Sequence, residues 1–197
     1  MTQRKSHASP QVGFTLIETM IAIVILTVGI LSLLSVFGTA VAVTQNAQEN
    51  LIARQKALQA MESIYTARNT QQITFAQIAN IASGGIFTNG ATKLLAAGND
   101  GLVNTADDAN FPVTGVCPAG PECLVLPGRD GILGTADDKP MILSNFTRQI
   151  QIGTVLEADG VTINPNLKQI TVTVNYFTGG NAAPHTYTVT ALISAFR

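Results

Sequence analysis

The chain has 197 residues, of which 46% are hydrophobic and only 12% are charged, about half the charged fraction of an ordinary globular protein. This composition excludes an intrinsically disordered chain and a basic nucleic-acid-binding domain. Eleven Lys and Arg residues against twelve Asp and Glu residues give a formal net charge of -1, so no overall field would attract DNA or an anionic substrate. The length suits one domain with a hydrophobic core.

The apolar residues are concentrated near the N-terminus, in a run from Met20 to Val43. A helix of about 20 apolar residues spans the hydrocarbon core of a bilayer, so this run is long enough to cross a membrane. Residues 1–13 precede it and carry Arg4 and Lys5, which favour a cytoplasmic N-terminus. The sequence therefore predicts a single membrane span with its C-terminal side outside the cytoplasm.

An ordinary secretory signal is the alternative for this segment, because Ala40-Val41-Ala42 has the small residues of a cleavage site. The run is longer than the roughly 7–15 apolar residues of such a signal, and Glu18 stands at its entrance. An unpaired carboxylate in hydrocarbon costs a few kcal/mol. Glu18 therefore requires a partner or a function.

The segment Gly13-Phe14-Thr15-Leu16-Ile17-Glu18, with the apolar run after it, resembles the class III signal of type IV pilins and pseudopilins. The resemblance implies that a prepilin peptidase cuts between Gly13 and Phe14 and then N-methylates Phe14. It also implies that the mature protein keeps the apolar helix. Residues 25–31 further resemble those of V-type minor pilins.

This resemblance divides the chain into a prepilin leader (1–13), a transmembrane and assembly half of a long helix (14–43) and a head domain (44–197). Glu18 lies one helical turn after Phe14, where it would compensate the helix dipole and the new N-terminal amine. In the family, the corresponding glutamate pairs with the N-terminal amine of a neighbouring subunit. Both roles remain open for Glu18 at this point.

Beyond Val43 the helix pattern continues as an amphipathic one with no Pro or Gly to end it, as far as about Arg68. The apolar positions expected to face the head recur at three-, four- and seven-residue spacings: Ala47, Leu51, Leu58, Met61 and Tyr65. A second, short helix is expected over residues 71–82, ended by Ser83-Gly84-Gly85.

The middle of the chain contains an internal repeat, because Asp100–Asp108 (DGLVNTADD) and Asp130–Asp138 (DGILGTADD) lie thirty residues apart. The two copies hold six of the twelve acidic residues. Residues 98–140 contain seven acidic and two basic residues, which gives this acidic repeat loop a local charge of -5.

Two interpretations of the repeat are open. Clustered carboxylates suit Ca²⁺, although the pattern is not that of an EF-hand. The candidate calcium ligands are Asp100, Asn104, Asp107, Asp108, Asp130, Asp137 and Asp138. Alternatively, each Asp-Gly pair makes a tight turn, and Thr105 or Thr135 caps a helical turn beside the paired aspartates. Turn chemistry explains each copy but does not explain why the motif occurs twice.

Between the two copies lies Cys117-Pro-Ala-Gly-Pro-Glu-Cys123. Zinc would need closer cysteine spacing and two further ligands, for which His185 is the candidate outside the leader. In an oxidising compartment, a disulfide between Cys117 and Cys123 fits the pattern better. We expect it to fix the shape of a surface loop.

From Met141 the periodicity changes to two, over residues 146–152, 168–177 and 186–193. Short connections favour an antiparallel meander over residues 141–197, with one apolar face that the amphipathic half of the helix covers. The predicted fold class is α+β, similar to that of type IV pilins.

We find no motif for a phosphate loop or a catalytic nucleophile, so the sequence does not indicate an enzyme. The resemblance implies a minor pilin that takes part in pilus assembly as a priming, tip or regulatory subunit, and it links the chain to adhesion and motility. The implied partners are the prepilin peptidase, major and minor pilins, the inner-membrane assembly machinery and the membrane, with no direct nucleic acid. The implied location is the inner membrane, with the head in the periplasm, and then a surface filament.

Two alternatives remain. One is a pseudopilin of a type II secretion system. The other is a membrane-anchored calcium-binding surface protein with a single span, which does not polymerise.

Overall fold

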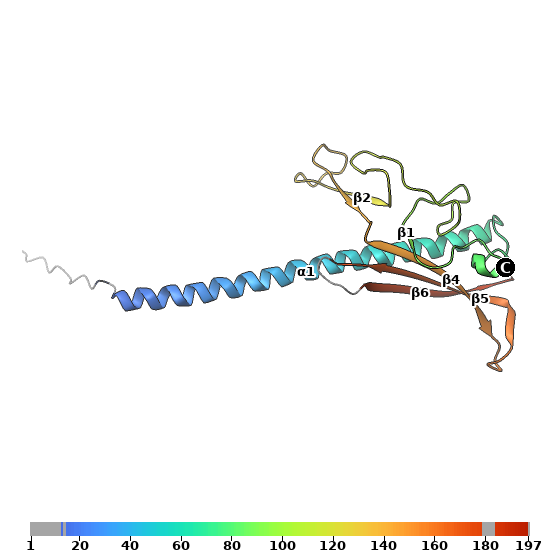
Figure 1. The fold of residues 1–197 in the computed structure, drawn as a ribbon, viewed down its shortest axis with the longest axis horizontal. Coiled ribbons are helices and arrows are strands. Elements are labelled where there is room, and N and C mark those ends of the chain that lie inside the picture. The colour runs from blue at the N-terminus through green and yellow to red at the C-terminus, as the bar shows by residue number, and fades with distance from the viewer. Residues whose placement is uncertain (1–12, 14, 179–183, 197) are drawn as a thin grey trace, which may run out of the picture. The chain divides into compact units, whose positions relative to one another are not determined.

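The computed structural model describes residues 13, 15–178 and 184–196, and the chain divides into two compact units, residues 1–45 and 46–197. One long helix, α1 (Leu16–Asn69), belongs to both units within this described part (Figure 1). It is followed by the short 3-10 helix η1 (Ile81–Ser83). The strands are β1 (Thr92–Lys93), β2 (Cys123–Leu126), β3 (Lys139–Ile142), β4 (Phe146–Leu156), β5 (Ile163–Tyr176) and β6 (His185–Ser194).

Local chemistry explains both ends of α1. The Thr15 hydroxyl accepts a hydrogen bond from the Glu18 N–H at 3.4 Å, as an N-terminal cap does. The sequence Thr15-Leu16-Ile17-Glu18 also has the spacing of a capping box. At the other end Gln71 has a φ of 64°, which cannot continue a right-handed helix. The predicted end near Arg68 is confirmed, whereas the predicted start at Phe14 lies outside the described residues.

In the second unit, α1 packs on the sheet through a face that is rich in alanine. Ala53, Ala57 and Ala60 are fully buried on this face. Met61 is buried as predicted, but Leu51 and Leu58 are 64% and 43% exposed. Ala47 is exposed as well, so the predicted head-facing stripe is wrong at these three positions. Helical periodicity showed an apolar stripe, but the sheet packs on the smaller residues beside it.

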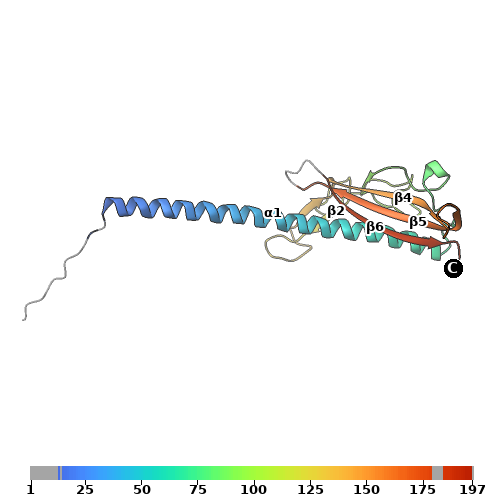
Figure 2. The same cartoon turned by 90° about the horizontal axis from the view of Figure 1, so that it is seen from below.

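The predicted antiparallel meander is confirmed, with strand order β1-β4-β5-β6. Figure 2 shows β4, β5 and β6 beside the second half of α1. Alternate residues face the helix: Phe146 and Ile150 on β4 lie opposite Tyr176 and Val172 on β5. All four are at most 2% exposed. The other face carries Thr, Gln and Asn, as period-two patterning requires. The chain therefore has the predicted α+β fold, in which the second half of a long helix packs on a C-terminal sheet.

The second helix expected over residues 71–82 is not formed, and only η1 is helical there. Thr74 and Gln77 instead close a turn, with the Gln77 side chain accepting from the Thr74 N–H at 2.8 Å. The Lys168 ammonium, from β5, donates to the carbonyls of Phe75 and Ile78, each at 2.8 Å. Because those carbonyls point at a lysine, they are not free for helical hydrogen bonds. The segment ends as expected, since Gly84 is left-handed at a φ of 79°.

Candidate functional site

The first unit exposes an unusually continuous apolar surface. Between Leu16 and Val43 the large apolar side chains are from 48% (Ile30) to 78% (Leu16) exposed. In the described part of the chain, α1 is the helix that is long and apolar enough to cross a membrane. An apolar surface of this extent marks a membrane or protein interface.

Most of the described hydroxyl groups of the first unit are satisfied by the helix itself. Five hydroxyl groups donate to a backbone carbonyl three or four residues earlier, at 2.8 or 2.9 Å. The donors are Thr19, Thr27, Ser32, Thr39 and Thr44. Hydroxyls bonded in this way need no water, so the helix is suited to hydrocarbon or to a bundle of like helices.

Glu18 lies exposed in the first turn of α1, where a carboxylate is favourable to the helix dipole. Phe14 and residues 1–12 lie outside the described residues. The cleavage bond between Gly13 and Phe14, the methylation of Phe14 and the assembly role of Glu18 therefore stay predictions.

The two acidic repeats are the tips of two hairpin-like turns in the second unit. We call residues 97–108 the first loop and residues 127–138 the second loop. The first is closed by the antiparallel bridge between Ala96 and Ala109, and the second by the pair Leu126 and Lys139 in β2 and β3. Each closing residue of the second loop lies thirty positions after its counterpart, so the structural repeat extends to the residues that close each loop.

The two loops share most of their internal hydrogen bonds. The first aspartate accepts from the N–H two residues on: Leu102 to Asp100 at 2.8 Å, and Ile132 to Asp130 at 2.9 Å. The last aspartate accepts from the N–H four residues earlier, at 2.7 Å in Asp108 and in Asp138.

The middle aspartates, Asp107 and Asp137, accept from the hydroxyls of Thr105 and Thr135 at 2.8 and 2.7 Å. These bonds lower the pKa of both carboxyls. Bonds to a carboxylate stabilise its charged form, so each loop is held together by its own ionised aspartates.

The residues at the fifth position of each repeat, Asn104 and Gly134, share a left-handed backbone, with φ of 61° and 91°. Asn and Gly are the residues that adopt this conformation most readily. Asn104 was predicted as a calcium ligand, for which Gly134 of the second copy has no side chain. In the structure this position instead has a backbone requirement that either residue meets.

Asn104 is not placed as a calcium ligand, because its side chain is bonded inside the head. Its amide oxygen accepts from Arg148 Nε at 2.6 Å, and its amide nitrogen donates to the Thr92 hydroxyl and the Arg148 carbonyl. Over the described ranges, no group of three or more His, Cys, Asp or Glu side chains is arranged to hold a metal ion. The structure shows the turn chemistry of the second interpretation, and calcium binding by the aspartates stays a prediction.

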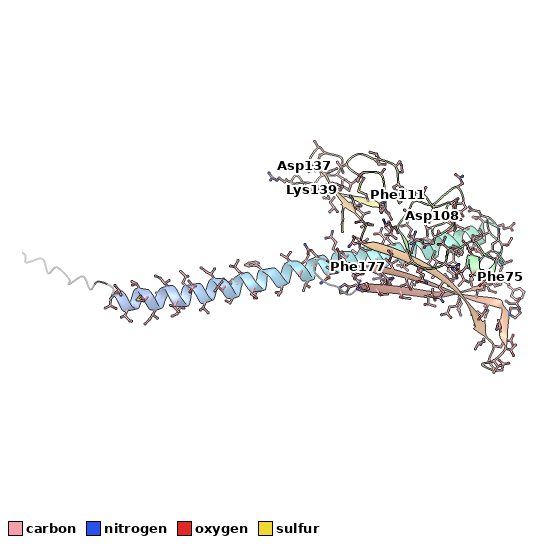
Figure 3. All side chains as sticks on the ribbon, viewed as in Figure 1. Phe75, Asp108, Phe111, Asp137, Lys139 and Phe177 are labelled. Atoms are coloured by element: carbon pink, nitrogen blue, oxygen red, sulfur yellow. A yellow bond between two sulfur atoms is a disulfide. The ribbon has the colours of Figure 1, made fainter. Side chains whose placement is uncertain are left out.

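The two loops differ sharply in their surroundings. Leu102 of the first loop is 1% exposed and belongs to the main core, whereas its counterpart Ile132 is 61% exposed. Val103 packs against that core, and its counterpart Leu133 is again 61% exposed. Figure 3 shows Asp137 at the outer end of the β2–β3 hairpin. The same loop is thus used once as a core element and once as a surface element.

Buried charges fix the first loop and β2 to the head. Arg148 on β4 is 3% exposed, and burial lowers its pKa to about 10 against the opposing effect of Asp108 and Glu122. Burial likewise raises the pKa of Asp108. On α1, Lys56 is 5% exposed and forms an ion pair with Glu122, immediately before β2. Sequence reasoning missed this cluster, because nothing in the spacing of these four residues predicts that they meet.

The predicted disulfide is present between Cys117 and Cys123, with a Cα–Cα distance of 5.9 Å. It closes the turn before β2, next to the bridge between Thr114 and Cys117. Both sulfurs are used in this bond, so they are not zinc ligands. His185 lies on β6 and stacks on the ring of Tyr176, with a centroid distance of 5.3 Å.

Comparison with known proteins identifies the N-terminal segment. The family model described as the prokaryotic N-terminal methylation motif matches residues 11–34. This match supports the interpretation of the segment as the class III signal of type IV pilins, and it does not extend to the head. Searches of curated proteins and of solved structures gave no match.

Proposed function

We propose that this chain is a type IV minor pilin, which is cleaved after Gly13, methylated on Phe14 and inserted into a filament through the first half of α1. The observation that carries the proposal is the methylation motif directly followed by a helix with exposed apolar side chains and internally bonded hydroxyls. In a protein that remained folded in water, a surface of this kind would be covered. Two surroundings suit this surface: lipid and a bundle of like helices. A pilin helix lies in lipid before assembly and in such a bundle within the filament.

The physical step is an exchange of one apolar environment for another. Before assembly, lipid surrounds the helix; afterwards, neighbouring helices do. The net gain from apolar burial is therefore small, and specific polar contacts have to set the register. Glu18 is suited to this task, because a carboxylate near hydrocarbon gains most from meeting the cationic N-terminus of a neighbour.

The test is recovery of the full-length, tagged protein in filaments sheared from cells of the source organism. We expect the wild type in the sheared fraction. Glu18→Ala should be processed and stable in the inner membrane but depleted from filaments, because the amine of its neighbour loses its partner. Glu157→Ala, which removes an exposed carboxylate from the turn after β4, is the control and should enter filaments normally.

Each other outcome identifies an alternative. Wild-type protein that never leaves the inner membrane would reject polymerisation and favour the anchored surface protein. Assembly that requires the motor of a type II secretion system, and not that of the pilus, would make the chain a pseudopilin. Normal incorporation of Glu18→Ala would reject the assembly role of Glu18 but not the proposed pilin function.

A further inference from the structure

The exposed apolar pair of the second loop, Ile132 and Leu133, has no role in the fold or in the proposed insertion of α1. Leu133 lines a hollow of about 380 Å³ beside Val116 and Val125. Both members of the pair remain 61% exposed. The same repeat also carries three aspartates: Asp130, Asp137 and Asp138.

The first loop shows how this type of loop docks. Asp100 and Leu102 line a shared hollow with Ser63 and Thr66 in the last turns of α1. The loop is also held by the Gln72 side chain, which donates to the Asp100 carbonyl. Leu102 is the residue that this docking buries. A loop of this backbone geometry therefore already packs an apolar side chain beside a helix in this head.

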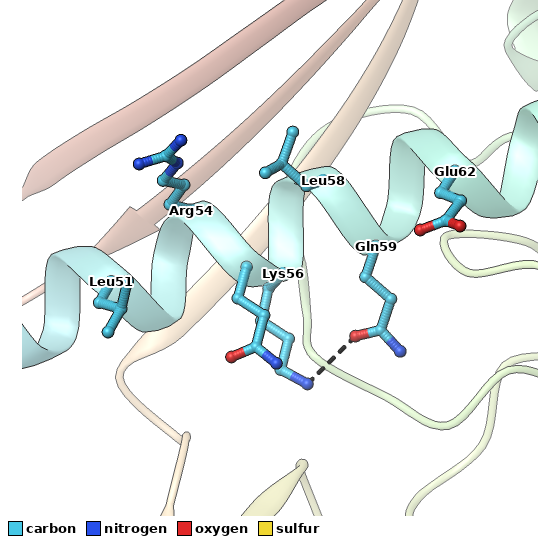
Figure 4. A pocket seen from close by; sticks show the side chains of 7 residues that line it. Leu51, Arg54, Lys56, Leu58, Gln59 and Glu62 are labelled. Carbon is cyan, nitrogen blue, oxygen red and sulfur yellow. Dashed lines mark hydrogen bonds between the residues drawn. The ribbon is translucent and has the colours of Figure 1, made fainter.

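A second helix face of suitable chemistry is exposed on the same chain. Leu51, Arg54, Leu58 and Glu62 line a groove of about 660 Å³ on α1 (Figure 4). Leu51 and Leu58 are seven residues apart and lie on one face, and Arg54 lies between them. We call this surface the α1 groove. It offers two leucines and a cation, whereas the second loop offers two aliphatic side chains among aspartates.

We propose that the second loop docks Ile132 and Leu133 into the α1 groove of a second copy of this chain, as the first loop packs beside α1 of its own head. Charge favours this pairing: the aspartates face Arg54, and Arg129 and Lys139 at the base of the second loop can face Glu62. The two surfaces are different, so the contact is head-to-tail and does not close on itself. Repeated contacts of this kind build a row of heads.

The contact is small for a protein interface, since it uses one loop and about three turns of helix. It therefore needs the high local concentration that a membrane or a filament provides. The contact does not require cleavage or methylation. The contact can therefore be absent while the proposed function holds, and it can be present while the proposed function fails.

The experiment uses the full chain in inner-membrane vesicles, with a photo-crosslinking amino acid in place of Leu133 and two differently tagged copies in the same cells. We expect a cross-linked dimer that carries both tags, whose joined peptide lies within residues 51–62. Moving the probe to Val161, which is 81% exposed on the turn after β4, is the matched control and should not give this product.

Variants of the groove test its chemistry. Leu58→Asp or Leu51→Asp should abolish the dimer without unfolding the head, because both positions are exposed in one copy. Arg54→Glu should lower the yield about two- to fivefold, as expected for one exposed ion pair. No dimer, a product within one chain, a product with another protein, or a joined peptide outside residues 51–62 would each overturn the proposal.

Discussion

The first and second loops have nearly the same sequence and share most of their internal hydrogen bonds, yet one is part of the core and the other is a surface element. The fold of each loop is therefore local, set by Asp-Gly turns and by Thr–Asp bonds. The position of each loop in the head depends on its contacts with the rest of the head. Asn104 joins the first loop to β1 and β4 through its side chain, and Gly134 has no side chain with which to do the same. The repeated motif specifies the shape of the loop, and contacts that the first loop alone makes, including those of the Asn104 side chain, attach it to the head.

The largest expected difference between the loops is the cost of removing their matched apolar residues. Leu102→Ala should lower the free energy of unfolding by about 2–5 kcal/mol, because it leaves a cavity in the core. Ile132→Ala should change it by less than about 0.5 kcal/mol, as surface substitutions do. Urea unfolding of the full chain in detergent measures both. Equal costs would contradict the assignment of one loop to the core and the other to the surface.

Exchanging Asn104 and Gly134, the two residues with a left-handed backbone, tests whether the Asn104 side chain attaches the first loop. Asn104→Gly keeps the backbone conformation but leaves Arg148 Nε without its acceptor, which should cost about 1–3 kcal/mol. Gly134→Asn should be tolerated within about 0.5 kcal/mol, because Asn accepts this backbone in the first loop. The same unfolding measurement applies. If Asn104→Gly is neutral, the attachment of the first loop lies elsewhere.

The glycine before each repeat gives a third matched pair. A Cβ at Gly98 would overlap the carboxylate and the carbonyl oxygen of Asp107, and one at Gly128 would overlap those of Asp137. Gly98→Ala should cost about 1–3 kcal/mol of unfolding free energy. Gly128→Ala should leave that energy nearly unchanged but speed tryptic cleavage at Arg129, since only the second loop opens. Cleavage at an unchanged rate would show that the second loop tolerates the added carbon.

The smallest effect concerns the titration of the middle aspartates. Their folded pKa values lie below the ordinary value of 3.8, mainly because of the threonine hydroxyls. The stability that they contribute is therefore present above pH 3.8 and is lost as the pH falls through the folded pKa. Thr135→Val should raise the pKa of Asp137 alone, and Thr105→Val that of Asp107 alone, in an NMR titration of the carboxyl carbons. Unchanged values would assign the shifts to backbone N–H groups.

The regular elements were the most predictable part of the fold. Alternating residues in β4, β5 and β6 predict both the strands and their buried face, and the uninterrupted pattern predicts α1. The strands β2 and β3 were missed, because each has four residues and the connection between them is longer than the strands themselves. The signal was present in the repeat: Leu126 and Lys139 lie thirty positions after Ala96 and Ala109.

At the candidate site, sequence reasoning found the signal segment, the disulfide and the repeat, all of which depend on local patterns. It misassigned Leu51 and Leu58, because helical periodicity identifies an apolar face but not which neighbour covers it. It also misassigned Asn104, since a side chain's partner across the fold is not encoded in spacing. In the sequence, Arg148 is a single charged residue within a predicted strand. Its contact with Asn104 is formed only in the tertiary structure.

The central claim, that the chain is a processed pilin subunit, is tested most directly by the mass of the mature N-terminus. The full chain is purified from the inner membrane of cells that contain the native prepilin peptidase, and its N-terminal peptide is sequenced by mass spectrometry. The account predicts a protein that begins at Phe14 with one methyl group on its amine. A protein that still begins at Met1, or one that begins at Val43 after removal of the apolar run, would contradict it.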